Sequence, residues 1–419
     1  MTVPRIHETT MEAGSKSTED DISSRVESAI AAFRRGEAIV IVDDEPDGFG
    51  VVVTAAEKVA QEQIAFMIRW GSGIISVPLR TERLNELELP MMVPHGRDQH
   101  RSAFTISVDA RVGVTTGISA ADRWRTIKTL IDRDTAPSDL TRPGHVYPVR
   151  YLPGGVLRRP GHAEAAVDLT NLACLYPAAV LTEMMDDKGS HLRTDDLARF
   201  AEAQGLAMIS LADLISYRRR RERLVERVFE SELLRGGVVY RAVCYRSLLD
   251  YSEHLVFTLG DVDFQRDPVL VAVHSECLAG DVFGAESCRC GPSLNRAFAM
   301  IERARRGALL YVRPGDTGCS VPQEGVGLHC DREDDVAQND LRDNGIAAQI
   351  LQDLGIRAVL LLTNQPAESG FIDVHGLTIV GSTPLVELEK PRIDVHEQPG
   401  GTSSSDSARA VVHPSHPTS

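Results

Sequence analysis

The sequence has no run of about 18 apolar residues, and its first residues carry no apolar stretch of the kind found in secretory signals. We therefore expect neither a membrane span nor a signal peptide, and we expect a cytoplasmic protein. Positive charge is also in deficit: 45 lysines and arginines stand against 60 aspartates and glutamates, a formal net charge of −15. So acidic a chain is not expected to bind nucleic acid, although local arginines can still build a phosphate site.

Cysteines are few and unevenly placed. The 419 residues include seven, and three of these, Cys277, Cys288 and Cys290, fall within fourteen residues. An odd number with this spacing favours a reducing compartment and metal chemistry over a disulfide framework. The length leaves room for two or three domains.

The three clustered cysteines predict a zinc site. Thiolates are good zinc ligands, and three protein ligands with one position left for water are typical of a catalytic zinc. Cys288 and Cys290 can share one tight turn that ends at Gly291, and Cys277 follows the apolar run Val269–Val273, which we interpret as a strand. Buried structural thiols, or a closed zinc site with a fourth protein ligand, are the alternatives. The Cys-x-Cys spacing favours zinc.

The hydrophobic pattern predicts two domains of the α/β and α+β classes. A helix with Val26, Ile30 and Phe33 on one face precedes an apolar strand, Ala38–Val42. In the second half, helices alternate with apolar strands such as Ala308–Val312, which favours a largely parallel sheet.

The chain divides by composition into five segments. We expect disorder in residues 1–20, which are polar, and in residues 393–419, which are rich in Gly, Ser and Pro. Domains are expected over 21–217 and 238–392. The stretch 218–237 begins with four arginines, and we interpret it as a linker.

The sequence from His274 to Leu294 resembles the zinc motif of GTP cyclohydrolase II, which opens the guanine ring of GTP at the head of riboflavin synthesis. The matching residues are His-Ser-Glu-Cys-Leu-x-Gly-Asp and then Cys-x-Cys-Gly-Pro-x-Leu. The resemblance runs to about Glu389. It implies that the three cysteines bind Zn²⁺, with Glu276 orienting the ligands, and that the substrate is a nucleotide.

Two further segments extend this resemblance. Asp340-Leu-Arg342 matches the family's Asp-x-Arg motif, which implies proton transfer by Asp340 and phosphate binding by Arg342. Thr363, in Leu-Thr-Asn-Gln-Pro, and Glu324, in the loop that matches a phosphate cradle, are the implied substrate contacts.

Three Gly- and Pro-rich loops in the first half resemble a second family, 3,4-dihydroxy-2-butanone 4-phosphate synthase, which acts on ribulose 5-phosphate with Mg²⁺. The loops are Gly113–Arg123, Arg142–Pro148 and Gly155–Ala165, within a match over about Ile22–Tyr217. The resemblance implies a site formed by Asp43, His145, Arg159, His162, Glu164 and Glu183. This order of domains is that of the bifunctional riboflavin biosynthesis proteins, and both families imply a homodimer.

The first domain departs from its family at the metal. Where the family has Asp-Asp-Glu-Asp-Arg-Glu-Asn-Glu-Gly-Asp, this chain has Asp43-Asp-Glu-Pro-Asp-Gly-Phe-Gly-Val, without the glutamate that ligates Mg²⁺. Ser76 and Ala163 stand where the family has cysteine and threonine. We therefore expect little or no synthase activity and a doubtful Mg²⁺ site.

The second domain departs from its family where phosphates bind. Ala272 stands at an arginine position, and the loop from Gln323 to His329 has no arginine. No tyrosine follows Tyr311, although the family uses a catalytic tyrosine there. Three functions stay open: a zinc cyclohydrolase with GTP or a related substrate, a non-catalytic scaffold that binds a partner, and a structural zinc closed by Cys319, His329 or Cys330.

Overall fold

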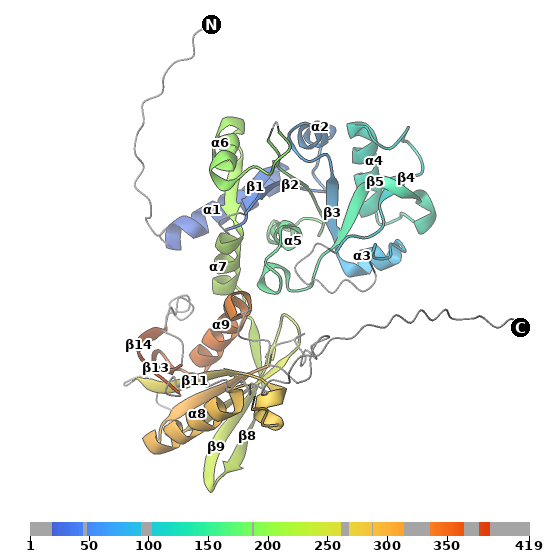
Figure 1. The fold of residues 1–419 in the computed structure, drawn as a ribbon. Helices are drawn as coiled ribbons and strands as arrows, with labels where there is room; N and C mark the ends of the chain where they lie inside the picture. The colour runs from blue at the N-terminus through green and yellow to red at the C-terminus, as the bar shows by residue number, and fades with distance from the viewer. Residues whose placement is uncertain are drawn as a thin grey trace, which may run out of the picture. The chain divides into compact units, whose positions relative to one another are not determined.

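The computed structural model describes residues 19–44, 48–93, 103–186, 188–260, 268–286, 288–313, 336–363 and 377–385, with only the backbone described for Glu19 and for 336–344. Within these ranges the chain forms two α/β domains, each built on a seven-stranded sheet (Figure 1). None of the described helices is long and apolar enough to cross a membrane.

The first domain holds a mixed sheet in the order β4-β5-β3-β6-β2-β1-β7. Its strands are β1 (Ile39–Val42), β2 (Gly50–Ala55), β3 (Ile75–Leu79), β4 (Val108–Ala110), β5 (Leu140–Arg150), β6 (Ala179–Glu183) and β7 (Ala207–Ser210). Its helices are α1 (Glu19–Arg35), α2 (Gln61–Trp70), α3 (Thr81–Glu86), α4 (Ala120–Ile131), α5 (His162–Leu172), α6 (Thr194–Gln204) and α7 (Leu211–Arg221), with short turns η1 (Pro137–Asp139) and η2 (Gly155–Leu157).

Helices cover both faces of this sheet. Ile39 and Ile41 of β1 pack with α1, α5 and α7, whereas Val40 and Val42 pack with α2, α4 and α6. This is why β1 is an unbroken apolar run instead of an alternating one. The helix predicted before it is confirmed, and it ends at Gly36, whose φ of 81° suits a glycine.

The second sheet has the order β14-β13-β11-β12-β10-β9-β8. Its strands are β8 (Val225–Arg235), β9 (Val238–Ser247), β10 (Glu253–Leu259), β11 (Val269–Ser275), β12 (Gly307–Val312), β13 (Ala358–Leu362) and β14 (Thr378–Thr383). Between them lie the π-helical turn η3 (Leu278–Val282), α8 (Cys290–Ala304) and α9 (Val336–Asp353).

Only half of this second sheet is parallel, so our prediction of a largely parallel sheet was partly wrong. β11 to β14 pair in parallel, whereas β8, β9 and β10 are antiparallel and meet β12 antiparallel. Parallel strands need a crossover, which α8 supplies between β11 and β12, while β8 and β9 are joined by the tight turn at Gly236 and Gly237. α8 packs on one face of the sheet through Phe298 and Ile301, and α9 packs on the other.

The stretch 218–237 is not a linker. Its first residues complete α7, and Val225–Arg235 is the edge strand β8. Arg218 is not solvated either: it is 9% exposed and its Nη1 lies 2.6 Å from Oδ2 of Asp168. At the chain ends, Glu19 and Asp20 belong to α1, and the predicted tails otherwise lie outside the described residues.

A buried histidine in the second sheet makes stability depend on pH. His254 is 1% exposed; its Nδ1 accepts a hydrogen bond of 3.1 Å from the backbone N–H of Arg313. Burial, and then the charge of Arg313, lower its pKa from 6.5 to about 4. An unfolded chain takes up this proton near pH 6.5, so stability is full above that value and falls as pH drops towards 4.

We expect this one group to cost ~3 kcal/mol of unfolding free energy between pH 7 and pH 4. His254→Asn should remove that part of the pH dependence. The measurement is the urea midpoint of unfolding of both proteins between pH 4 and pH 7, with unfolding monitored by circular dichroism. If the midpoints of the two proteins changed equally with pH, His254 would not be the source of this pH dependence.

Candidate metal centre and candidate site of the first domain

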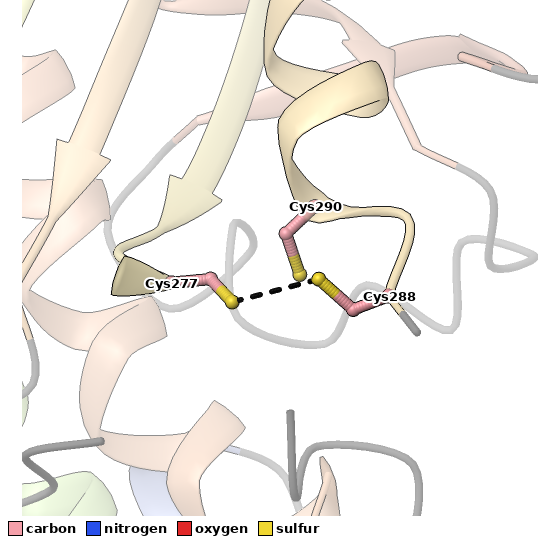
Figure 2. Close-up of side chains that lie close together, drawn as sticks. All are labelled: Cys277, Cys288 and Cys290. Carbon is pink, nitrogen blue, oxygen red and sulfur yellow. Dashed lines mark hydrogen bonds between the residues drawn. The ribbon is translucent and has the colours of Figure 1, made fainter. Parts of the chain in front are cut away.

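The three clustered cysteines come together at one end of β11. Cys277 follows that strand and begins η3, while Cys288 and Cys290 lie on the turn that opens α8 (Figure 2). Their sulfur atoms all lie within 4.8 Å of one another, and those of Cys277 and Cys288 are 3.8 Å apart. A tetrahedral zinc about 2.3 Å from each sulfur needs sulfurs about 3.8 Å apart, so the three thiols fit such an ion.

Two glycines let the two segments approach. A Cβ on Gly280 would lie 2.5 Å from Sγ of Cys288, and one on Gly291 would lie 2.3 Å from the carbonyl oxygen of Gly280. The N–H of Gly280 also points at Sγ of Cys277, at 3.4 Å. N–H groups of this turn and of the first turn of α8 favour negative charge, as thiolate ligands require.

Gly280→Ala is therefore expected to separate Cys288 from its partners and weaken zinc binding at least tenfold, an effect of the size seen when residues that orient metal ligands are replaced. The measurement is competition with a chromophoric chelator. Gly381→Ala on β14 is the control, because the nearest neighbour of its added methyl would be the flexible Cδ1 of Leu360, at 3.2 Å. Equal zinc affinity in both variants would contradict this reading of the packing.

A carboxylate that the sequence analysis left without a role lies beside this centre. The side chain of Asp281 is 3% exposed, and its oxygens contact the backbone N–H of Cys277 (2.8 Å), the hydroxyl of Tyr311 (2.9 Å) and Nε2 of His274 (3.0 Å). Burial by itself raises the pKa of Asp281, but the hydrogen bonds from His274 and Cys277 outweigh it and hold the pKa below its usual value. The motif His-Ser-Glu-Cys-Leu-x-Gly-Asp contained this residue, but only the fold reveals its partners.

The other predicted residues of this domain have mixed outcomes. Glu276 neighbours the centre and accepts a hydrogen bond of 3.2 Å from Nε of Arg313. The N–H of Thr363, at the end of β13, donates to the carbonyl of Thr383. Glu324 and the side chains of Asp340 and Arg342 lie outside the described residues, so their roles stay predictions.

In the first domain, two strand ends bring acidic residues to one edge of the sheet. β2 lies between β1 and β6; Val42 pairs with Gly50, and Glu183 pairs with Val51, so Asp43 and Glu183 flank the start of β2. His162, at the start of α5, has a buried Nε2 with no hydrogen-bond partner among the described residues. Burial lowers the pKa of His162, against the pull of Asp43 and Glu183.

An aromatic ring fills the space beside that histidine. The ring of Phe49 lies 5.0 Å from the rings of both His162 and His191. Glu183 is paired with Nε2 of His191, at 2.8 Å. An orphaned imidazole nitrogen suits a cation, but an apolar ring and an occupied carboxylate do not, so these side chains do not form a set of oxygen ligands suited to Mg²⁺.

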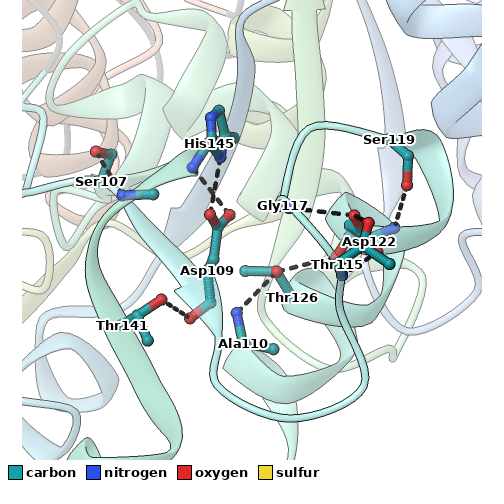
Figure 3. A network of polar contacts seen from close by, with 11 residues as sticks. Ser107, Asp109, Ala110, Thr115, Gly117, Ser119, Asp122, Thr126, Thr141 and His145 are labelled. Carbon is teal, nitrogen blue, oxygen red and sulfur yellow. Dashed lines mark hydrogen bonds and ion pairs between the residues drawn. The ribbon is translucent and has the colours of Figure 1, made fainter.

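His145 belongs to a separate network (Figure 3). Its Nδ1 lies 2.8 Å from Oδ2 of Asp109, whose Oδ1 accepts from the His145 backbone. The neighbouring loop is held by Asp122, which accepts from Thr115 and Gly117. The hydrogen bond from the Thr115 hydroxyl holds the pKa of Asp122 below its usual value. Our sequence analysis missed both aspartates, because their partners are set by the fold.

The remaining pair of predicted residues is also satisfied internally. Arg159 forms an ion pair with Glu164, which is 1% exposed and accepts a further hydrogen bond from the N–H of Leu152, at 3.1 Å. By these contacts the six predicted residues fall into three groups: Asp43 with His162 and Glu183, His145 with the unpredicted Asp109, and Arg159 with Glu164.

Comparisons with known proteins agree with the division of the chain into two domains. Residues 27–217 match the 3,4-dihydroxy-2-butanone 4-phosphate synthase family, and residues 226–384 match the GTP cyclohydrolase II family. The second match begins within β8, the first strand of the second domain.

Similar proteins cover nearly the whole chain. The riboflavin biosynthesis protein RibBA of Nocardia farcinica is 46% identical over 86% of this chain and 90% of its own length. The probable bifunctional riboflavin biosynthesis protein RIBA 2, chloroplastic, of Oryza sativa subsp. japonica is 45% identical over 88% of this chain and 70% of its own.

A solved structure shares both domains. RibBX of A. baumannii, described as a two domain 3,4-dihydroxy-2-butanone 4-phosphate synthase, has a TM-score of 0.68 and 30% identity, over 86% of this chain and 99% of its own. With both domains matched in order and relatives similar over most of their length, this chain belongs to the family of bifunctional riboflavin biosynthesis proteins.

Proposed function

We propose that the second domain is a zinc-dependent cyclohydrolase that opens the ring of a purine or related nucleotide and releases formate. The observation that carries this proposal is the convergence of three thiols within 4.8 Å, at a spacing that suits tetrahedral zinc. The match to the GTP cyclohydrolase II family supports the same reaction, and the names of the relatives place them in riboflavin biosynthesis.

Each group has a proposed role. Cys277, Cys288 and Cys290 hold the ion, which when bound supplies a Lewis acid and an activated water. Asp340 accepts a proton and Arg342 binds phosphate, as a carboxylate and a guanidinium can. Glu276 orients the site through its contact with Arg313. Glu324 and Thr363 contact the substrate.

We propose that the substrate carries fewer phosphates than GTP or binds more weakly than GTP does in the family. Ala272 is 1% exposed and packs in the apolar cluster with Phe298 and Leu309, so this position offers no cation. Each charge-assisted phosphate contact is worth roughly 1.5–3 kcal/mol. Losing this arginine and the one in the loop after Gln323 would cost several orders of magnitude in triphosphate affinity.

We also propose that the first domain has little or no synthase activity. Its sequence lacks the acidic run that supplies the family's metal ligand, and Phe49 lies against His162 where a cation would need oxygen ligands. The names of the relatives favour two active domains, so the assay described in the Discussion decides. The retained fold suits a homodimer, which light scattering tests.

The decisive experiment incubates the zinc-loaded protein with GTP, GDP, GMP and guanosine, and measures formate. Formate from one or more of these supports the cyclohydrolase. If the protein is fully loaded with zinc and releases no formate from any of them, a non-catalytic scaffold that binds a partner becomes the better-supported function. A protein that binds no metal would exclude both zinc readings.

A further inference from the structure

Cys277 is held on both sides of its own backbone by a single residue, Asp281. The carboxylate of Asp281 accepts from its N–H at 2.8 Å, and the N–H of Asp281 donates to its carbonyl at 2.7 Å. Two hydrogen bonds between the same pair fix the peptide planes on either side of the Cys277 Cα, and with them the direction of its Cα–Cβ bond.

Asp281 is in turn fixed from the sheet. Its carboxylate, 3% exposed, receives the hydroxyl of Tyr311 at 2.9 Å and lies 3.0 Å from Nε2 of His274. His274 and Tyr311 are register partners on β11 and β12, and their rings stack with centroids 5.5 Å apart. The carboxylate thus joins two central strands to the turn that presents the thiol.

We propose that Asp281 is a positioning residue that sets the geometry of Cys277 before a metal binds, and that Tyr311 and His274 act on the metal site only through it. A buried carboxylate that receives three donors has little freedom to rotate. Partners of this kind outside the ligands themselves typically change metal affinity by about 10–100-fold when they are replaced. The inference rests on the proposed metal site but not on its hydrolytic activity.

The test uses the full-length protein and zinc alone. Asp281→Asn replaces one acceptor oxygen by an amide donor, and we expect zinc affinity to fall about 10–100-fold in chelator competition. Tyr311→Phe removes one hydroxyl and should lower zinc affinity several-fold. Tyr240→Phe is the matched control, because it loses an equivalent hydroxyl bond, of 2.8 Å to Glu302, on the same sheet.

Two further readouts separate positioning from stability. The apo forms of Tyr311→Phe and Tyr240→Phe should unfold at similar temperatures, while only the first loses zinc affinity. Cobalt(II) in place of zinc should give altered thiolate absorption in Asp281→Asn and an unchanged spectrum in Tyr240→Phe. Wild-type zinc affinity in both Asp281→Asn and Tyr311→Phe would overturn the inference, as would a wild-type protein that binds no zinc. Zinc binding that responds as expected, without formate release, would overturn the cyclohydrolase but leave the inference standing.

Discussion

Cys277→Ser should lose bound zinc and formate-releasing hydrolysis together. A serine hydroxyl at neutral pH is a far poorer zinc ligand than a thiolate, and two cysteines alone do not hold a catalytic ion. The bound ion contributes several kcal/mol of transition-state stabilisation, so the expected fall in turnover is at least about 1,000-fold. Metal content by elemental analysis and formate by a coupled assay are the two measurements.

The control for this variant is Cys174→Ser, which removes an exposed thiol of the first domain. We expect it to keep wild-type zinc and wild-type turnover. Hydrolysis that persists in metal-free Cys277→Ser would show that the reaction does not use this centre, and the proposed mechanism would be wrong.

Purified protein should convert ribulose 5-phosphate, with Mg²⁺ present, at least about 1,000-fold more slowly than an active synthase does. A lost metal ligand removes several kcal/mol of charge stabilisation, which corresponds to a rate loss of this size. His145 and Glu164 cannot compensate, because each is already paired inside the protein, with Asp109 and Arg159. The RibBA protein of Nocardia farcinica, assayed in parallel, gives the reference turnover under the same conditions.

Magnesium binding gives this prediction a second readout. Isothermal titration should detect no Mg²⁺ site in the first domain, and Mg²⁺ should not raise its melting temperature. Turnover at the rate of the relative would refute the proposal, and it would mean that Phe49 leaves His162 able to act with ligands outside the described residues.

The elements that could be predicted are those whose signal is local. β1 is an apolar run of four residues, α1 repeats its apolar residues every three to four positions, and Cys-x-Cys places two ligands on one turn whatever the rest of the chain does. These patterns need no knowledge of distant partners. The third ligand, Cys277, was predicted from the apolar strand that precedes it, and the family resemblance implied the same residue.

The parts that could not be predicted depend on contacts distant in sequence. The sequence of β8 resembles a polar connector. Most of its residues are exposed, and apolar side chains are mixed with charged ones along the strand. Arg218 was placed in a linker because its partner, Asp168, lies 50 residues earlier in the sequence. The role of Asp281 depends on the register that sets His274 beside Tyr311.

The three thiols fall within fourteen residues, on one turn and the helix start that faces it. An ion held there would cross-link only a short ring of chain, and closing so small a ring constrains little of the remaining polypeptide. The metal would thus fasten a single corner of the second sheet, whose apolar core on both faces lies elsewhere. Chelation should therefore yield a folded apo-enzyme whose sheet withstands heating much as before, and to which catalysis returns when the cation is restored.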